Sequence, residues 1–325
     1  RYRDCVNWNL DSDFGTPFPK RYVGPTHHFQ LVFNWCWELI KHLPALFKLR
    51  REYRKRPPNP DPRVVLFSDS LDEVNGIAIS ARLLVRAIRK QGHNATLLGV
   101  SAHTRNGRGI VEADGTILCP QVFSMEMVGY DESELSIPSL REIIRYFKRH
   151  KIDLVEIETP SSGGMMALVI SKIVGIKVIS HYRTDVYSYL QMLVANQPIV
   201  QLFAKTWVKV FSRLSSPVIV PSTHFKEKLQ VDVGLKADQV ALLPRGADLK
   251  NYSPQNREGK YWENHFKEQG SVRFSFVGRV SEEKELPFLE EVWRDYSATH
   301  PEAQLLIVGK GPYLEKMKSR CADLN

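Results

Sequence analysis

The sequence predicts an α/β protein in which parallel sheets are covered by helices, and three observations support this fold class. Short apolar runs alternate with amphipathic stretches from residue 63 onward, as in chains built from βα units. The proline cluster PPNPDP at 57–62 sets off the residues before it, because neither a helix nor a central strand tolerates such a cluster. The strand series then restarts near Arg273, which indicates a second domain.

This division predicts three regions. Residues 1–62 are an accessory N-terminal segment with an amphipathic helix, residues 63–242 form one Rossmann-like domain, and residues 243–325 begin another. The last region holds only two or three βα units, whereas a complete domain of this type needs about five or six. We therefore expect the second domain to be incomplete in this chain.

Hydrophobic periodicity predicts the individual elements. Strands are expected at short apolar runs, which lie at 64–67, 95–98, 154–157, 177–179, 218–220, 240–243, 274–277 and 304–308. Helices are expected where apolar residues recur at three- and four-residue steps, at 77–90, 138–148, 165–174, 224–229 and 287–296. Pro198 should break the apolar stretch 186–214 into two helices.

Composition and charge exclude several classes of protein. With 43% hydrophobic residues, the 325-residue chain is globular rather than disordered. Its formal net charge of +9 favours phosphate-bearing partners such as a nucleotide or an anionic membrane. Nucleic acid is not expected, because the cations gather at 48–56 instead of forming a stripe with interleaved aromatic residues. Four scattered cysteines and the lack of a transmembrane run predict reduced thiols, no metal site and a cytoplasmic protein.

Gly76 is the first candidate binding residue. In VVLFSDSLDEVNGIAISARLL, at 64–84, an apolar strand runs into a polar loop and Asn75-Gly76 opens a helix. A helix N-terminus offers free N–H groups to an anion, and a glycine lets the backbone approach a phosphate. The alternative is an ordinary βα turn, in which Asn-Gly is common.

Two cations form a second candidate site. In FSFVGRVSEEKELPFLEEV, at 274–292, a strand ends at Gly278, Arg279 follows in the loop, and Lys284 precedes a helix. Such a pair at the carboxyl end of a strand can clamp a pyrophosphate. Alternatively, both cations form salt bridges with the neighbouring glutamates on a solvated face.

The third candidate is SHYRTDVYSYL, at 180–190, directly after a predicted strand. His181 can donate a hydrogen bond to a sugar hydroxyl, Arg183 can contact a phosphate, and Asp185 can orient either of them. Gly246 and Asp248, in the loop LPRGADLKNYSP, are expected to face the same cleft. The alternative is a set of polar surface residues on a loop.

Seven motifs, in this order, resemble the retaining glycosyltransferase family 4: DEVNGIA, EIETPSSGG, SHYRTD, VPST, LPRGADLKNYSP, VGRVSEEKEL and IVGKGPYLEKM. The resemblance implies a GT-B fold, in which two Rossmann-like domains face a cleft. It also implies a nucleotide-sugar donor and no obligatory metal or other cofactor. By this resemblance Arg279 and Lys284 hold the diphosphate of the donor, and Gly76 approaches a phosphate.

The chain departs from the family pattern at two places. The family usually has a histidine immediately before the Thr-Asp pair, whereas here Arg183 takes that position and His181 lies two residues earlier. The acidic Ex7E motif of the family is expected beyond Asn325, so part of the donor site should lie outside this chain. Two alternatives therefore stay open: a degenerate GT-B domain acting as a scaffold, and a nucleotide-sugar 2-epimerase.

The N-terminal segment has a character of its own. On a helical wheel, FQLVFNWCWELIKHLPALFKL at 29–49 has a broad apolar face with two tryptophans, and six cations follow within 48–56. This pattern is typical of a helix that lies in a membrane interface. The alternative is a helix that packs on another domain. The family resemblance implies a hexosyltransferase, and the first interpretation adds a lipid or membrane-linked glycan acceptor and a peripheral position on the inner face of the membrane through residues 29–56.

Overall fold

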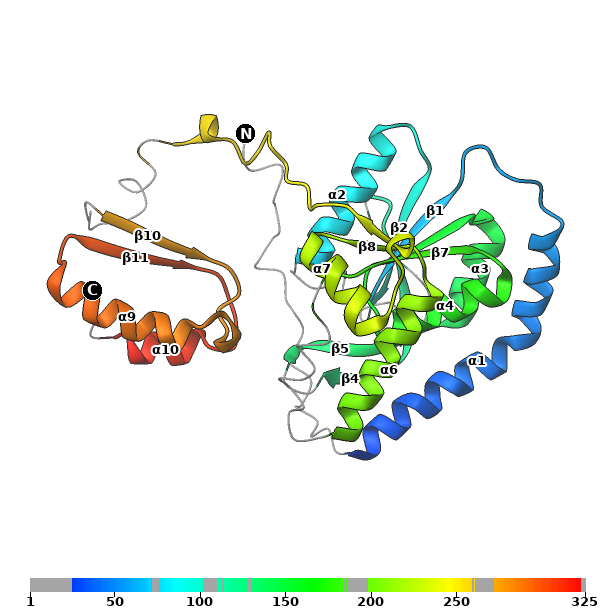
Figure 1. Cartoon of the computed structure of the whole chain (residues 1–325), viewed down its shortest axis with the longest axis horizontal. Helices are drawn as coiled ribbons and strands as arrows, with labels where there is room; N and C mark the ends of the chain where they lie inside the picture. Colours follow the sequence, from blue (N-terminus) through cyan, green and yellow to red (C-terminus); the bar gives the residue numbers. More distant parts are fainter. Residues whose placement is uncertain are drawn as a thin grey trace. The chain divides into compact units, whose positions relative to one another are not determined.

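The computed structural model describes residues 25–69, 71, 76–101, 110–112, 114–127, 130–183, 185, 198–258, 260 and 272–322. The chain divides into two compact units, Arg1–Gly246 and Ala247–Asn325 (Figure 1). The division lies close to the boundary expected between 242 and 243. Asn75 and residues 186–197 of the predicted motifs and helices lie outside the described residues.

The first unit is built on one mixed sheet whose order is β3-β4-β2-β1-β6-β7-β8-β9, with β5 paired to β4. Its strands are β1 (Val64–Ser68), β2 (Ala95–Ser101), β3 (Ile110–Val111), β4 (Ile117–Met127), β5 (Tyr130–Pro138), β6 (Leu154–Ile157), β7 (Lys177–His181), β8 (Val218–Val220) and β9 (Val240–Leu242). All neighbours are parallel except the pairs that β4 forms with β3 and β5. The chain leaves β1 toward β2 and later returns on the other side to β6. The sheet therefore has its topological switch point between β1 and β6, where open α/β sheets bind ligands.

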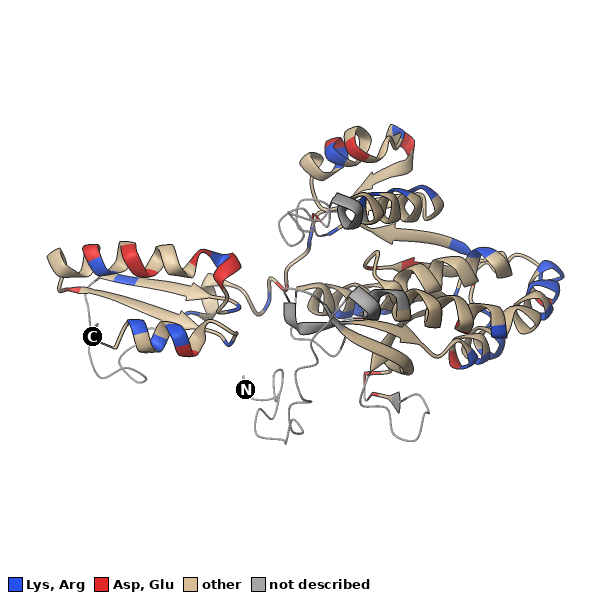
Figure 2. Ribbon diagram, turned by 90° about the horizontal axis from the view of Figure 1, so that it is seen from below, with Lys and Arg blue, Asp and Glu red and all other residues tan. Residues whose placement is uncertain are grey.

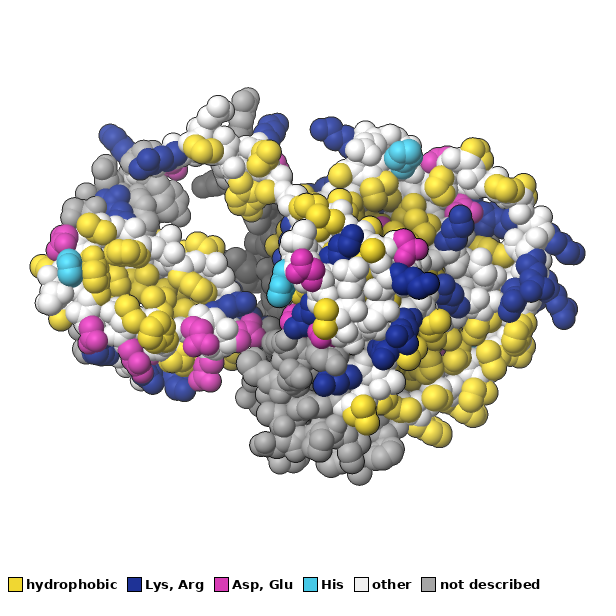
Figure 3. Space-filling model, in the orientation of Figure 1, with side chains coloured by type: hydrophobic (Ala, Val, Ile, Leu, Met, Phe, Trp, Pro, Cys, Tyr) yellow, Lys and Arg dark blue, Asp and Glu magenta, His cyan; other side chains and the backbone are white. Residues whose placement is uncertain are grey.

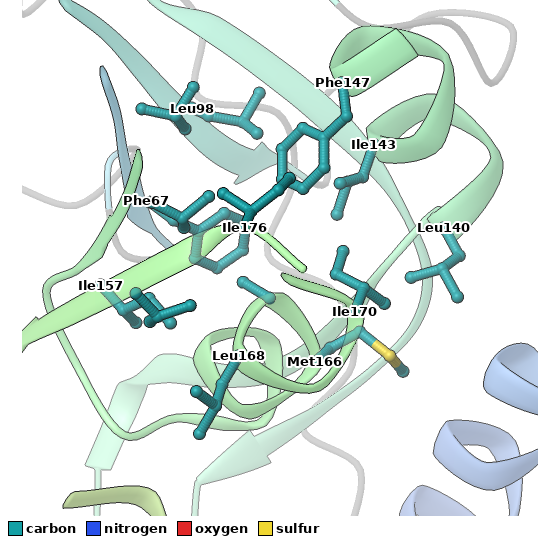
Figure 4. Packing of buried hydrophobic residues seen from close by; sticks show 14 of the residues in the cluster. Phe67, Leu98, Leu140, Ile143, Phe147, Ile157, Met166, Leu168, Ile170 and Ile176 are labelled. Carbon is teal, nitrogen blue, oxygen red and sulfur yellow. The ribbon is translucent and has the colours of Figure 1, made fainter. Parts of the chain in front are cut away.

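Helices cover both faces of this sheet. They are α1 (Pro25–Arg54), α2 (Gly76–Lys90), α3 (Leu140–His150), α4 (Ser162–Val174), α6 (Pro198–Leu214) and α7 (Thr223–Lys228); a π-helical turn (Leu229–Val233) and a 3₁₀ turn (Ala237–Gln239) follow α7. Strand β1 shows how the faces separate, because Val65 and Phe67 join the core under α1, α3 and α4, whereas Leu66 joins the core under α2. Figure 4 shows the first of these cores, where Phe67 lies among Leu98, Ile157 and Ile176.

Helix α1 is part of the first unit. Leu46 and Leu49 are buried in its main core, and Tyr53 donates a hydrogen bond to the Phe147 carbonyl, 2.9 Å away. The buried carboxylate of Glu38 accepts a hydrogen bond from the backbone N–H of Leu140, at the start of α3. The helix expected at 29–49 thus packs on its own unit along one face and continues through the basic residues to Arg54.

The second unit contains a two-stranded parallel sheet, β10 (Val272–Val277) and β11 (Ala303–Val308), with α9 (Leu286–Thr299) and α10 (Leu314–Arg320). Short 3₁₀ turns lie at Pro254–Asn256 and Glu282–Lys284. Val280, Leu286, Tyr313 and Met317 form its small core. In the parts of the chain that the structure describes, none of the helices has the length and hydropathy needed to cross a membrane.

Candidate functional site

The carboxyl ends of β1, β6 and β7 bring the polar residues of the first unit together at the switch point. Ser161 caps α4 and accepts a hydrogen bond from the Gly164 N–H, while Asp69, directly after β1, accepts one from the Thr159 hydroxyl at 3.1 Å. Asp69 also accepts a bond from the Gly163 N–H at 3.3 Å, and burial raises the pKa of Asp69. The ends of β1 and β6 are therefore fixed to each other through the start of α4.

Gly164 is required by this close packing. A Cβ at that position would stand 2.1 Å from the Thr159 carbonyl oxygen, which belongs to the backbone and cannot move aside. The SSGG part of the motif EIETPSSGG is thus explained by the tight entry of the chain from β6 into α4.

Four ionisable side chains form a buried cluster at the carboxyl ends of β6 and β7. Glu156 and His181 contact each other through Oε1 and Nε2, and Oε1 of Glu158 lies 3.8 Å from the same nitrogen. The guanidinium of Arg183 meets Glu158 along two edges, with Nε 2.8 Å from Oε2 and a bond donated from Nη2 to Oε1 at 3.2 Å. His181 and Glu158 are 3% and 1% exposed. The cluster is therefore shielded from solvent.

Burial sets the electrostatics of Glu158. It raises the pKa of this carboxyl group, and the positive charges of His181 and Arg183 oppose the shift without cancelling it. Buried, charge-coupled groups of this kind gather at functional sites more often than elsewhere. At a switch point, this is a sign of a ligand site.

Arg245 extends the cluster toward solvent. Its Nη2 donates a hydrogen bond to the Arg183 carbonyl at 3.1 Å, and its Nη1 lies 3.9 Å from the place where a Cβ would stand on Gly76. The Arg245 side chain is exposed, whereas that of Arg183 is buried against Glu158. An accessible cation thus lies beside the first residue of α2, where backbone N–H groups also favour an anion.

The structure shows contacts at 181–185 that were not expected. The Asp185 carboxylate pairs with Lys228 of α7 at 2.7 Å and accepts a hydrogen bond from the Tyr182 hydroxyl. Glu156 and Glu158 contact His181, and Glu158 also contacts Arg183, because Glu156 lies in β6, Glu158 directly follows it, and β6 pairs in parallel with β7.

The other predicted residues lie at the corresponding edge of the second unit. Arg279 is half-buried directly after β10, and Lys284 is exposed, with Nζ 3.8 Å from Glu283. Glu282 pairs with Lys316 at 2.9 Å instead. Asp248 has a local role, since it accepts bonds from the N–H groups of Lys250 and Asn251 in its own turn.

The motifs VGRV and VGKGP meet in this unit. The Val280 N–H donates to the Lys310 carbonyl at 2.9 Å, and the Tyr313 N–H donates to the Val280 carbonyl at 3.0 Å. Gly309 has a φ of 155°, and a Cβ there would stand 1.8 Å from the Gly278 oxygen. Only glycine allows the two loops to lie this close.

Sequence reasoning missed Glu156, Glu158 and Arg245 as site residues. A signal for the first two was present, since two acids alternate with apolar residues in VEIE, and a charge within a buried strand requires a partner. For Arg245 no local pattern separates it from other loop cations. Its importance depends on contacts with Arg183 and Gly76, which are remote in sequence.

The cluster also contains a possible metal-ligand set. One ligand atom from each of Glu156, Glu158 and His181 lies within 4.8 Å of the others. Carboxylate and imidazole groups are common ligands of divalent ions. However, the guanidinium of Arg183 already lies against Glu158 and supplies positive charge to the cluster. The arrangement fits an ion-pair network better than a metal centre.

Comparison with known proteins identifies the family. The model of Glycosyltransferase Family 4 matches residues 74–251, more than half of the chain, and this range includes the whole cluster and Gly76. The chain belongs to glycosyltransferase family 4. The predicted family is thereby confirmed, although the motifs VGRVSEEKEL and IVGKGPYLEKM lie outside the matched range.

Two curated proteins show how far this family 4 chain extends along its relatives. It is 23% identical over 267 residues to an alpha-monoglucosyldiacylglycerol synthase of Streptococcus pneumoniae, covering 81% of this chain and 59% of that protein. It is 24% identical over 250 residues to a GDP-mannose-dependent alpha-mannosyltransferase of Mycobacterium tuberculosis, covering 77% and 63%. The chain thus spans about three fifths of the length of these relatives.

Solved structures show the fold of this family 4 chain. A sucrose-phosphate synthase from Thermosynechococcus elongatus superposes with a TM-score of 0.61 at 17% identity, covering 79% of this chain and 67% of the other. HepE of Anabaena, in complex with UDP and glucose, gives a TM-score of 0.55 at 15% identity, covering 81% and 66%. The predicted GT-B fold is confirmed by these similarities.

Proposed function

We propose that the protein is a hexosyltransferase that transfers a sugar from a nucleotide-sugar donor to a lipid or glycan acceptor, with retention of the anomeric configuration. The observation that carries the proposal is the exposed Arg245 guanidinium beside Gly76, at the switch point of a family 4 unit. Relatives named for a glucosyl lipid and for GDP-mannose support the classes of acceptor and donor.

In this proposal, Arg245 and the backbone at Gly76 bind a phosphate of the donor. Arg279 and Lys284, which the family resemblance assigns to the diphosphate, are proposed as phosphate-binding residues of the second unit. When the sugar leaves, negative charge develops on the diphosphate, and fixed cations stabilise that charge increasingly as the bond breaks. The residues assigned to the donor need no metal ion or other cofactor for this effect.

We propose positioning roles for the buried residues. Glu158 fixes the guanidinium of Arg183, and the carbonyl of Arg183 holds Arg245 at the helix N-terminus. His181 joins Glu156 to this network. Asp185 is joined to α7 through its ion pair with Lys228. In this account the arginine at position 183 acts through Arg245 rather than on the sugar.

A lipid or membrane-linked acceptor is reached at a membrane surface. We therefore propose a cytoplasmic protein that is peripheral on the inner face of the membrane.

A transfer assay with the full-length protein tests the proposed function. The protein is incubated with UDP- and GDP-linked hexoses and with diacylglycerol vesicles or short oligosaccharides, and products are identified by mass spectrometry and NMR. We expect a glycosylated acceptor with the anomeric configuration of the donor and one nucleoside diphosphate released per sugar. Donor binding without transfer would support a scaffold instead, and interconversion of donors that differ at C2 would support an epimerase.

Lys284 allows a separate test of the cations in the second unit. Lys284→Ala should weaken nucleotide binding by about 1.5–3 kcal/mol, the range for a hydrogen bond to a charged group. Lys316→Ala removes a similarly exposed cation that pairs with Glu282, and it should leave binding unchanged. If calorimetry shows that Lys284→Ala binds the nucleotide as tightly as Lys316→Ala does, Lys284 does not belong to the donor site.

A further inference from the structure

Helix α1 has an inner face that packs on the first unit. Leu31, Trp35 and Leu39 lie against the main core, and Leu46 and Leu49 are buried in it. The Trp35 indole N–H donates to the Ser162 carbonyl at 3.2 Å, which ties the helix to the start of α4. This face is fully accounted for by contacts within the unit.

The outer face of α1 is apolar as well, and it is exposed. Phe33, Trp37, Ile40 and Phe47 are 67%, 56%, 57% and 49% exposed. At 100° per residue these four positions fall within about a quarter of the circumference, so they form one stripe along the helix. Figure 3 shows hydrophobic side chains gathered along the lower edge of the first unit, where α1 runs. An exposed aromatic stripe of this kind marks a binding surface.

Positive charge continues the same stripe. Arg51 lies four residues after Phe47 on the same side of the helix, and Lys48, Arg54 and Lys55 are exposed beside it. Figure 2 shows Lys and Arg gathered at the C-terminal end of α1. The helix has two acids: Glu38 is buried, and Glu52 lies 3.7 Å from Lys148. The outer face therefore combines an apolar stripe with a net positive end.

We propose that the outer face of α1, defined by Phe33, Trp37, Ile40, Phe47 and Arg51, docks on an anionic membrane surface. The aromatic side chains insert at the boundary between headgroups and acyl chains, and the cations contact anionic headgroups. Charge complementarity favours an anionic lipid surface, because the exposed stripe ends in Arg51 with Lys48, Arg54 and Lys55 beside it, and a second copy of the chain would bring the same positive charge. The proposal requires neither a donor nor transfer.

Flotation of the full-length protein with vesicles tests this surface. Phosphatidylcholine vesicles with and without phosphatidylglycerol are the probes, and Phe33→Ser/Trp37→Ser is the main variant. Phe288→Ser, at a residue 64% exposed on α9, is the matched control. We expect the double variant to bind anionic vesicles about tenfold more weakly or worse, and the control to bind as the wild type does. Circular dichroism and UDP or GDP binding should be unchanged in all of them, which separates this test from that of the proposed function.

Charge reversal provides a second variant that keeps the apolar stripe. Arg51→Glu/Lys55→Glu should reduce binding to anionic vesicles and make the remaining binding insensitive to salt. Undiminished vesicle binding by Phe33→Ser/Trp37→Ser would overturn the proposal. So would a wild-type dimer in lipid-free solution that these substitutions convert to a monomer, because a second copy would then be the occupant.

Discussion

Strand β6 has a carboxyl group next to each end, and the surroundings shift the pKa values of these two groups in opposite directions. Asp153, just before the strand, accepts hydrogen bonds from the Arg63 N–H at 3.0 Å, from Asn59 at 2.9 Å and from Arg56 at 2.8 Å. Burial by itself raises the pKa of Asp153, but these bonds and the Arg56 charge outweigh it, and the pKa falls below the ordinary value. Glu158, just after the strand, has a pKa raised by burial in spite of the opposing influence of His181 and Arg183.

This difference separates stability from function within a single strand. At the amino end, Asp153 joins the segment that follows α1 to the sheet through Arg56, Asn59 and Arg63, and its negative charge stabilises these contacts. At the carboxyl end, Glu158 is held against Arg183 in spite of an unfavourable degree of burial, and the Arg183 carbonyl in turn holds Arg245. A carboxyl group that is buried unfavourably at the switch point of a sheet indicates a functional role rather than a stabilising one.

The largest expected effect is at Glu158. Glu158→Ala leaves the buried Arg183 guanidinium without its carboxylate, so we expect a loss of about 3–5 kcal/mol in the free energy of unfolding. Urea denaturation measures this loss. Glu52→Ala, at an exposed ion pair, should change stability by less than about 0.5 kcal/mol. A near-neutral Glu158→Ala would show that the cluster is not a coupled unit.

Asp153 should give a smaller loss with no effect on ligand. Asp153→Asn keeps the shape but removes the charge and weakens three hydrogen bonds, so we expect a loss of about 1–3 kcal/mol in unfolding free energy. UDP or GDP affinity, measured by calorimetry on the same protein, should stay at the wild-type value. Reduced nucleotide affinity in this variant would contradict the division between the two ends of the strand.

The smallest expected effect concerns pH: the contributions of Asp153 and Glu158 to the free energy of unfolding should change with pH in opposite directions. The folded-state pKa of Asp153 lies below its ordinary 3.8, so its stabilisation is present above that pH and is lost as the pH falls through the folded-state value. The pKa of Glu158 lies above its ordinary 4.5, so the folded state keeps a proton that the unfolded state has lost. Its contribution to stability therefore decreases as the pH rises from 4.5 through the folded-state value.

Denaturation across this pH range separates the two groups. The stability advantage of wild type over Asp153→Asn should shrink on acidification below about pH 4, and its advantage over Glu158→Gln should shrink as the pH rises above about 4.5. Glu52→Gln, at an exposed carboxyl, serves as the control. The difference in unfolding free energy between wild type and variant should change with pH in opposite directions for Asp153→Asn and Glu158→Gln. Changes in the same direction would show that the two ends of β6 are electrostatically alike.

Much of the fold was predictable from the sequence because buried parallel strands are continuous apolar runs. The eight predicted strands, from 64–67 to 304–308, correspond to observed ones. The hairpin of β4 and β5 was not predicted, because Pro120 interrupts one strand and acids fill the other. The inner face of α1 was also beyond prediction, since apolar residues surround most of that helix and only packing selects Leu46 over Phe47.

The candidate site was less predictable than the fold. His181 and Arg183 were identified from their place after a strand, and the structure brings them together. Their contacts with Glu156 and Glu158 were not predicted, because nearness in sequence favoured Asp185, whereas parallel pairing of β6 and β7 places the two glutamates beside them. Contacts between neighbouring strands cannot be derived from spacing within one loop.

The most direct measurement is the affinity of UDP and GDP for Arg245→Ala by isothermal titration calorimetry. Arg149→Ala is the matched control, because Arg149 is an exposed cation near the end of α3, just before β6 begins at the opposite edge of the sheet. We predict a loss of about 1.5–3 kcal/mol in binding free energy for Arg245→Ala, and none for Arg149→Ala. Wild-type affinity in Arg245→Ala would contradict a diphosphate site at the switch point of the first unit.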